Sequence, residues 1–345
     1  MTTVNERILD AQIKHSIFLE RYKGGVLRKI IGQLNDSEAD LIELIAGRLA
    51  GIEQRGFDLG PASTKRLQKL LDDIRHKRTE TYAVLESRLS SEMGEFSQYE
   101  ADFQIRLAQS AGVTHTFALP SNAQLKAIVT SQPFGDEKGM RLLSAWAKGV
   151  GEQEIKRVHS AIRLGLTQNE TTDQIVRRIR GTKARGYQDG LLEISRRDAE
   201  AVTRTAVAHV QNRARMEVYN ANADIVDQLQ YVATLDSRTT LVCASRDGKV
   251  YILSKAPALP AHFRCRSILV AYFKDDEVGN RASITGPVPA DTTYAAFLKK
   301  QSIAFQEDVL GVERSRLFRA GTPLDKFVDK SGRTYTLAEL RKRET

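Results

Sequence analysis

The sequence predicts a mainly α-helical protein with a small α+β domain. Two observations support this fold class. Apolar residues over 67–96 recur mostly at steps of three and four, the period of an amphipathic helix, and most other stretches before about residue 220 are helical in character. Between residues 229 and 273, short β-branched and aromatic runs alternate with Asp-Gly and Pro turns, which is typical of strands. We therefore expect long N-terminal helices, a helical middle, a short antiparallel sheet near 229–273 and a helical C-terminal tail.

The first hundred residues predict two long helices. The first covers about residues 5–49, with only Gly24 and Gly25 as an internal breaker. The stretch GFDLGPAST at 56–64 supplies Gly, Pro and a capping Ser or Thr, so one helix stops and the next starts there. Apolar positions over 64–96 then form one stripe. Neither helix can bury its stripe alone. The two therefore pack as a hairpin, or one of them packs against a partner chain.

A series of shorter helices is expected next. The connector AGVTHTFALPSNAQ leads into them at 111–124. One of them is well delimited, because Thr171 or Thr172 can cap its start and Gly181 its end. The expected helices cover 121–130, 136–148, 152–165, 171–180 and 188–220.

Three short strands are expected to form the antiparallel sheet. The stretch RDGK at 246–249 predicts a hairpin between strands, because Asp247-Gly248 tolerates the positive φ angles of a tight turn. The expected strands cover 229–236, 249–254 and 266–273.

The C-terminal part is predicted to be a linker and a helical tail. The linker begins near Gly279, contains GPVPAD, and leads into a helix near 294–310. The chain then divides into a long-helix region (1–113), a core of helices and sheet (114–278) and a linker with its tail (279–345).

Positive charge is concentrated in one part of the chain. The net charge is +9, and between Lys156 and Arg215 thirteen Lys and Arg face six Asp and Glu, a local excess of +7. Such an excess is either a solvated helix face or a surface for phosphate backbones or another acidic partner. The candidate DNA contacts are Arg177, Arg178, Arg180, Lys183, Arg185, Arg196 and Arg197.

Neither a membrane span nor a secretory signal is expected. The longest apolar runs, such as SILVAYF at 267–273, fall well short of the roughly 18 residues that a span needs. The N-terminus lacks the basic-then-apolar design of a signal peptide. We therefore expect synthesis in a reducing cytosol, where a disulfide is the less common use of two cysteines.

Both cysteines of the chain, Cys243 and Cys265, are close in sequence to His262. Thiolate and imidazole are zinc ligands, and His-x-x-Cys is a valid half-site spacing. A structural zinc site usually has four Cys or His ligands, so the fourth ligand here would be Asp247 or water. A Cys243–Cys265 disulfide, or two buried thiols that pack as small apolar groups beside a hydrogen-bonded histidine, remain open alternatives.

The sequence contains no convincing catalytic motif. The P-loop and the motifs GxSxG, HExxH and GxGxxG are absent. PAHFRC lacks both the His-x-Glu pair and the second cysteine of a zinc deaminase. A Cys–His nucleophile pair is not excluded, but no glycine run that would build an oxyanion hole stands beside it.

Three stretches resemble the head-morphogenesis domain of tailed-phage minor head proteins, the Mu F-like family. They are TRTAVAHVQNRARMEVY, YVATLDSRTTLVCASRDGKVY and PALPAHFRCRSILV. The C-terminal stretches AAFLKKQSIAFQEDVLG, RSRLFRAG and LAEL are similar to the tail of many members, so the resemblance covers about 203–345. The matching residues are Arg204, Thr205, Asp236, Arg238, Thr239, Cys243, Asp247, Gly248, Lys249, Pro260, His262, Cys265, Arg266 and Ser267. We take Arg204, Asp236, Arg238, Asp247, Gly248 and Arg266 as structural motif residues.

The resemblance implies a non-enzymatic structural protein. It would be made in the host cytoplasm and built into the virion capsid in few copies near the portal vertex. Its partners would be the portal oligomer, major capsid or scaffold proteins and, non-specifically, double-stranded DNA, with no membrane. One alternative is a metal-dependent hydrolase of nucleic acid centred on Cys243, Asp247, His262 and Cys265, although carboxylates for a hard metal are scarce there. Another is a host nucleic-acid-binding regulator, but the basic helices offer mainly phosphate-binding side chains.

Overall fold

The computed structural model describes residues 3–54, 61–136, 139–273, 280–289, 291–329 and 332–342. Helices dominate this part of the chain, and three small antiparallel sheets supply the strands. The predicted mainly α fold with a small α+β part is confirmed. No helix within the described residues is both long enough and apolar enough to span a membrane.

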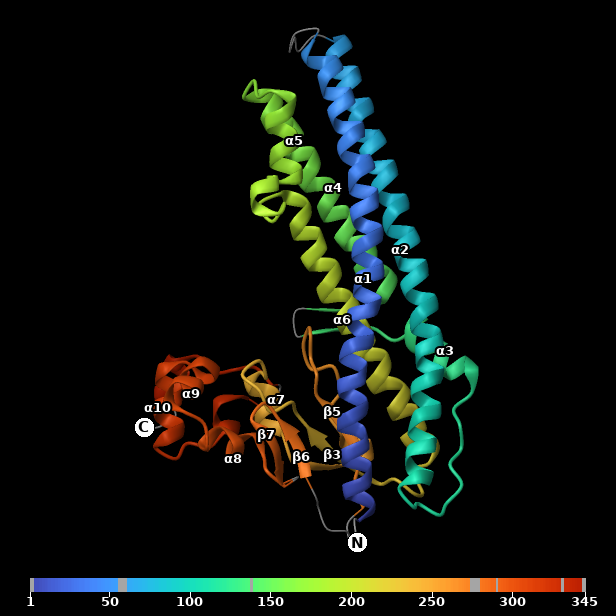
Figure 1. Cartoon of the computed structure of the whole chain (residues 1–345), viewed down its shortest axis with the longest axis vertical. Coiled ribbons are helices and arrows are strands. Elements are labelled where there is room, and N and C mark those ends of the chain that lie inside the picture. Colours follow the sequence, from blue (N-terminus) through green and yellow to red (C-terminus); the bar gives the residue numbers. More distant parts are fainter. Residues whose placement is uncertain are drawn as a thin grey trace.

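Two helices of 50 residues each, α1 (Val4–Glu53) and α2 (Pro61–Ser110), run the length of the molecule (Figure 1). They pack on each other as a hairpin, one of the two arrangements that the sequence allows. A capping box between Thr3 and Glu6 starts α1. The Gly24-Gly25 pair does not interrupt α1. The two glycines lower helix stability by about 1 kcal/mol each, which is small beside the free energy gained by burying an apolar stripe along the whole helix.

The other helices complete a bundle along this hairpin. They are α3 (Asn122–Thr130), α4 (Leu143–Thr167), α5 (Thr172–Arg180) and α6 (Leu191–Ala221). The separate helices expected at 136–148 and 152–165 are wrong. A small hairpin of β1 (Phe134–Asp136) and β2 (Gly139–Arg141) precedes a single α4. Gly151 does not break α4. It lets α4 approach α2, since a Cβ there would lie 2.7 Å from the Tyr82 ring.

A three-stranded antiparallel sheet packs at the base of the bundle. Its order is β4-β3-β5, and the strands are β3 (Gln228–Val232), β4 (Val250–Ile252) and β5 (Ile268–Ala271). The expected sheet is thus present with shorter strands. The hairpin expected at 246–249 is wrong, because helix α7 (Leu241–Arg246) lies between β3 and β4. Gly248 does have a positive φ of 78°, and its N–H donates to the Tyr231 carbonyl at 2.8 Å.

The C-terminal part forms a small lobe beside the sheet (Figure 1). Part of the expected linker is a hairpin of β6 (Asn280–Ser283) and β7 (Gly286–Pro289), which the sequence did not predict. The helix expected near 294–310 is two helices, because Ser302 caps a new start after Lys300. The helices of the lobe are α8 (Tyr294–Lys299), α9 (Ile303–Leu310), α10 (Val312–Arg319) and α11 (Leu337–Arg341).

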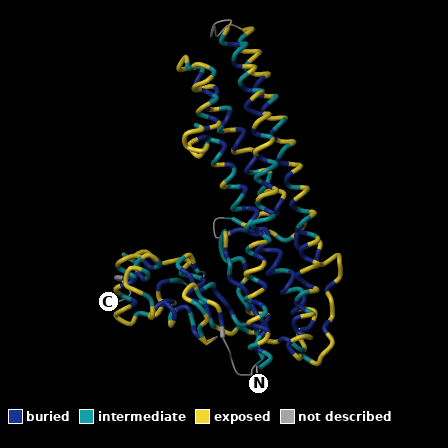
Figure 2. Tube along the Cα trace, viewed as in Figure 1, coloured by how far each residue is buried: buried dark blue, intermediate teal, exposed yellow. Residues whose placement is uncertain are grey.

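One apolar core joins the long helices to the rest of the chain. It includes Leu19 of α1, Tyr82 of α2, Val207 of α6, Tyr231 of β3 and the Cys265 side chain. The buried positions follow the inward faces of the helices along the whole bundle (Figure 2). The three-part division of the chain stays a prediction, and the packing shows that the helices of the first part share their core with the second.

A buried polar network crosses this core. Glu100 of α2 accepts hydrogen bonds from Gln104 at 2.7 Å and from Arg215 of α6 at 2.9 Å, and it contacts His15 of α1 at 2.6 Å. Arg215 also donates to the Leu269 carbonyl of β5 at 3.3 Å. Burial opposes ionisation of Glu100, but the charge of Arg215 and the hydrogen bond with His15 outweigh it and lower the carboxyl pKa. The network therefore links two long helices, α6 and the sheet.

Candidate functional site

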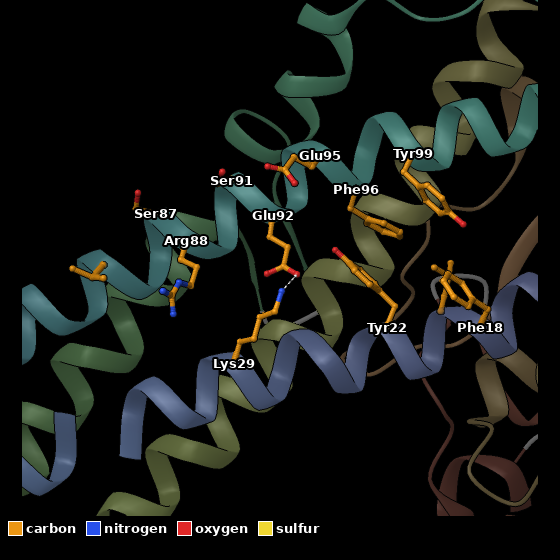
Figure 3. Close-up of a pocket in the computed structure, with 12 residues that line it drawn as sticks. Phe18, Tyr22, Lys29, Ser87, Arg88, Ser91, Glu92, Glu95, Phe96 and Tyr99 are labelled. Atoms are coloured by element: carbon orange, nitrogen blue, oxygen red, sulfur yellow. Dashed lines mark hydrogen bonds and ion pairs between the residues drawn. The ribbon is translucent and has the colours of Figure 1, made fainter. Parts of the chain in front are cut away.

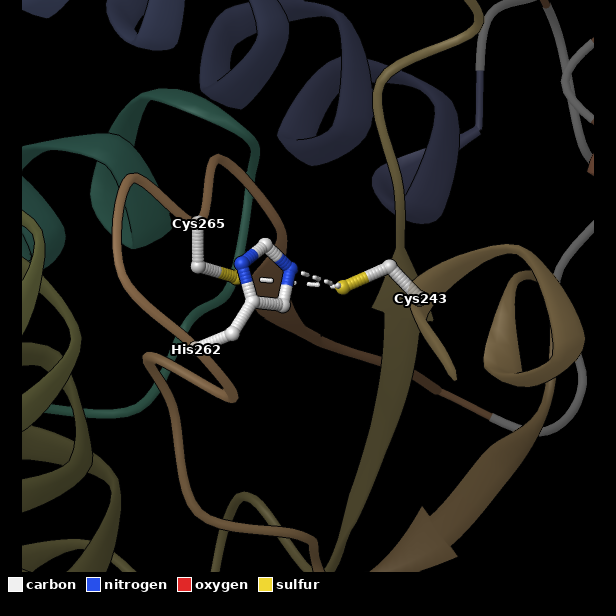
Figure 4. A group of neighbouring side chains, drawn as sticks. All are labelled: Cys243, His262 and Cys265. Carbon is white, nitrogen blue, oxygen red and sulfur yellow. Dashed lines mark hydrogen bonds between the residues drawn. The ribbon is translucent and has the colours of Figure 1, made fainter. Parts of the chain in front are cut away.

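Cys243, His262 and Cys265 form one compact cluster (Figure 4). The Cys243 sulfur lies 3.3 Å from His262 Nε2 and 3.8 Å from the Cys265 sulfur. The three ligand atoms all lie within 4.8 Å of one another. Both thiols are buried and free, so the disulfide alternative is not what this structure contains.

The loop that carries His262 and Cys265 is held in place by α6. The Arg264 N–H donates to Thr205 Oγ1 of α6 at 3.1 Å. Arg264 has a positive φ of 60°, which is unusual for a residue with a side chain. The Cys265 N–H donates to the His262 carbonyl at 3.2 Å, closing a tight turn. This turn brings both side chains toward Cys243 on α7.

Hydrogen bonds orient the imidazole and the Cys243 sulfur. His262 Nδ1 lies 2.8 Å from the Phe263 carbonyl, which can only accept, so Nδ1 carries a proton. In the neutral ring, the lone pair of Nε2 then faces Cys243. Thr240 Oγ1 lies 2.9 Å from Nε2, and the Tyr231 hydroxyl donates to the Cys243 sulfur at 3.3 Å. The ring orientation is therefore fixed from outside the cluster.

The contacts shift the pKa values of the two thiols in opposite directions. The hydrogen bond with Cys265, helped by His262, holds the pKa of Cys243 well below its ordinary value. The same hydrogen bond, together with burial, raises the pKa of Cys265. Burial lowers the pKa of His262, but its contact with Cys243 outweighs this and raises it. Cys243 is thus the more readily ionised of the two thiols, and the thiolate form is both a metal ligand and a nucleophile.

Asp247 does not join this cluster, which corrects its expected place as a fourth ligand. Its carboxylate binds Arg281 through two hydrogen bonds of 2.8 and 3.0 Å. It also accepts from the Ala233 N–H at 2.6 Å and from the Tyr294 N–H at 2.7 Å. These four bonds use the acceptor positions of a carboxylate. Asp247 therefore ties the sheet to β6 and α8.

The other structural motif residues are close to the cluster. Asp236 accepts two hydrogen bonds from Arg266, at 2.6 and 2.8 Å, and these contacts outweigh burial and lower its carboxyl pKa. Arg238 reaches the same carboxylate at 3.6 Å, and Arg204 pairs with Glu200 at 2.8 Å. The sequence placed these residues in one motif, and the structure brings them to one side of the cluster.

A cationic cavity of about 330 Å³ opens beside His262 and Cys265. Its wall is formed by α1, by α6 and by two loops, one with Arg238 and Thr240 and the other covering 262–266. Sequence reasoning did not single out Thr240, Arg264, or the α1 residues Glu20 and Lys23. Thr240 and Arg264 adjoin motif residues, but nothing local in the sequence marks the α1 residues. The charged residues that line the cavity are Lys23, Arg204, Arg238, Arg264 and Arg266, against Glu20 and Glu200.

The seven candidate DNA contacts lie on α5, on the loop with 3₁₀ helix η1 (Lys183–Arg185) and at the start of α6 (Figure 1). Arg196 and Arg197 are within about one helical turn of Glu200 at this cavity. Four of them have partners within the chain. Arg178 pairs with Glu170, Arg197 with Glu193 at 3.1 Å, and Arg196 with Glu38 and Glu193. Arg180 lies over the Tyr187 ring, 4.5 Å from its centroid.

Three candidates remain available to a partner. Arg177, Lys183 and Arg185 are exposed, and none forms an ion pair with another residue in the described ranges. Their expected role in binding DNA stays a prediction.

A separate open cavity of about 800 Å³ lies between α1 and α2 (Figure 3). Phe18, Tyr22, Phe96 and Tyr99 line it, and the Tyr22 and Phe96 rings stack with centroids 4.8 Å apart. Burial and the nearby carboxylates of Glu92 and Glu95 raise the pKa of Tyr22. No motif residue lines this cavity, so it is distinct from the Cys–His cluster.

Comparison with known proteins matches the region around the cluster. Residues 155–270 fit the family model described as phage Mu protein F like protein. This part of the chain is similar to the Mu F-like family. The Mu F-like segment covers about a third of the chain, from within α4 to β5, and includes all three cluster residues and the basic helices. No curated protein and no solved structure matches the chain. The Mu F-like family consists of structural phage head proteins.

Proposed function

We propose that this protein is a structural head-morphogenesis protein of a tailed phage. The observation that carries the proposal is the Mu F-like match over 155–270, which contains the whole ordered motif from Arg204 to Ser267. The protein assembles in the host cytoplasm and enters the virion near the portal vertex. Its partners are the portal oligomer and major capsid or scaffold proteins.

The proposed assembly role is tested by following the protein into particles. Co-expression with the portal protein of the same phage should give a complex that survives size-exclusion chromatography. Mass spectrometry of purified virions should detect the chain at few copies relative to the major capsid protein. Its absence from purified virions would contradict the proposal.

The protein is also proposed to contact packaged double-stranded DNA without sequence preference. Arg177, Lys183 and Arg185 support this step, because they are exposed on adjoining elements and lack ion-pair partners among the described residues. Each cation that neutralises a phosphate releases counterions, so binding should be weak and fall steeply with salt.

The DNA contact has a charge-matched test. Changing Arg177, Lys183 and Arg185 together to Ala should weaken binding equally on unrelated duplexes and flatten the salt slope by up to about three units. The measurement is fluorescence anisotropy over a salt series.

The control removes the same charge from the opposite end of the molecule. Lys255, Lys299 and Lys300 are exposed and form no ion pair within the described residues, so changing them to Ala should leave the slope nearly unchanged. If both triple variants lose the same DNA affinity, the effect comes from net charge and not from this surface. No DNA binding at low salt would contradict the DNA contact while leaving the head proposal standing.

We propose that this protein does not catalyse a reaction. The hydrolase alternative required Asp247 in the centre, and Asp247 is bound to Arg281 and two backbone N–H groups instead. A nuclease assay with added Mg²⁺ or Zn²⁺ tests this part. Cleavage that is lost in His262→Ala would restore the hydrolase interpretation.

A further inference from the structure

We infer that Cys243, His262 and Cys265 bind one Zn²⁺ ion, with a water molecule as the fourth ligand. The inference concerns the local chemistry of the cluster and does not depend on the head-morphogenesis role. The donor set decides the metal, because two thiolates and an imidazole suit zinc, whereas Mg²⁺ and Ca²⁺ take oxygen ligands.

Two of the three spacings between the ligand atoms are close to those around a tetrahedral ion, and the third, between Cys265 and His262, is at most 4.8 Å. Two sulfur atoms bound at about 2.3 Å to a tetrahedral zinc lie about 3.8 Å apart, and a sulfur and an imidazole nitrogen lie about 3.6 Å apart. The Cys243 and Cys265 sulfurs are 3.8 Å apart, and Cys243 lies 3.3 Å from His262 Nε2. A disulfide would require sulfur atoms about 2.0 Å apart.

The surroundings provide the contacts that orient zinc ligands. A metal-bound histidine usually gives its other ring N–H to a carbonyl or carboxylate, which fixes the ring. His262 does this with the Phe263 carbonyl at 2.8 Å, leaving Nε2 toward the two sulfurs. The turn that carries His262 and Cys265 is held by α6 through Thr205. The three donors are therefore preorganised, with Cys243 on helix α7 and both His262 and Cys265 on one turn that α6 holds.

The fourth position has room for one water. A small cavity of about 10 Å³ is lined by Thr240, Cys243 and His262, among others, and about 10–15 Å³ is the smallest cavity that holds one water. The hydroxyl of Thr240, 2.9 Å from His262 Nε2, can accept a hydrogen bond from such a water. No carboxylate completes the cluster among the described residues.

The first test measures metal in the unaltered protein. Tag-free chain purified without chelator should contain about one zinc per molecule by plasma mass spectrometry. Replacement by Co²⁺ should give an intense thiolate-to-cobalt absorption band and the strong visible bands of a tetrahedral site. Chelation should lower Tm, because metal that binds only the folded state stabilises it. Metal-free protein with free thiols, or with a Cys243–Cys265 disulfide by mass spectrometry, would overturn the inference.

Variants then locate the metal. Cys243→Ser, His262→Ala and Cys265→Ser should each reduce zinc content at least tenfold, and the cobalt band should weaken with each lost sulfur. The matched control is His115→Ala, because His115 is exposed and lies outside the cluster. This variant should keep full zinc content and the cobalt spectrum. Zinc retained in all three cluster variants would place the metal elsewhere and overturn the assignment.

Discussion

Removing the charge of Glu100 should be among the most destabilising single changes in this protein. In Glu100→Gln, Arg215 stays fully buried without its counter-ion, since both side chains have essentially no exposure. Breaking a buried pair from one side costs about 3–5 kcal/mol. At about 1.4 °C per kcal/mol for a chain of this size, Tm should fall by roughly 4–7 °C.

Urea unfolding at pH 7, followed by circular dichroism, measures this loss. The double variant Glu100→Leu with Arg215→Met should recover most of it, because it removes both buried charges. Asp40→Ala is the control. Asp40 of α1 pairs with Lys77 of α2 at 3.1 Å in solvent, so its loss should cost less than about 1 kcal/mol. A Glu100→Gln loss as small as that of Asp40→Ala would refute the reasoning.

Two further outcomes follow from buried groups and backbone geometry. Burial, with the charge of Arg213, lowers the pKa of His209 from 6.5 to about 4, so the unfolded chain binds more protons between these pH values. The free energy of unfolding should therefore fall by up to about 3 kcal/mol as pH drops from 6.5 to 4. His209→Gln should flatten this part of the curve of urea midpoint against pH. If the variant's curve matches that of the unaltered protein, other groups cause the loss. Gly248→Val should give insoluble protein, because φ is 78° and the new Cβ would lie 3.0 Å from Thr293 Cγ2. Gly248→Asn should lower the yield of soluble protein less than Gly248→Val does, because Asn tolerates a positive φ better. A Val variant as soluble as the unaltered protein would contradict the strain argument.

Helices with strong local signals could be predicted from the sequence, and elements defined by distant packing could not. The helix α5 has its capping Thr171 and terminal Gly181 where the sequence places them. The break expected inside α4 was wrong because Gly151 serves contact with Tyr82, a residue far away in the chain. Likewise, the Asp247-Gly248 pair correctly predicted a positive φ at Gly248. It did not predict the helix α7 just before it, because α7 is too short to leave a periodic pattern in the sequence.

The candidate site shows the same limit. His-x-x-Cys spacing was enough to bring His262 and Cys265 together, and the isolated Cys243 was expected beside them. The role of Asp247 was not predictable, because its partner Arg281 lies in a segment that the sequence presents as a linker. In the basic stretch, charge counting could not reveal that Arg196 reaches Glu38 on α1, since that pairing depends on helix packing.

The shared core also limits how this chain can be exchanged between genomes. Val207 and Tyr231 of the Mu F-like segment are buried in the same cluster as Leu19 of α1 and Tyr82 of α2. A recombination event that moved only residues 155–270 would leave the apolar partners of these residues behind. The apolar surface that this exposes to water would cost about 25 cal/mol of stability per Å². Viable mosaics should therefore inherit both long helices together with the recognisable segment. Breakpoints are then expected outside the segment's own borders, upstream of α1.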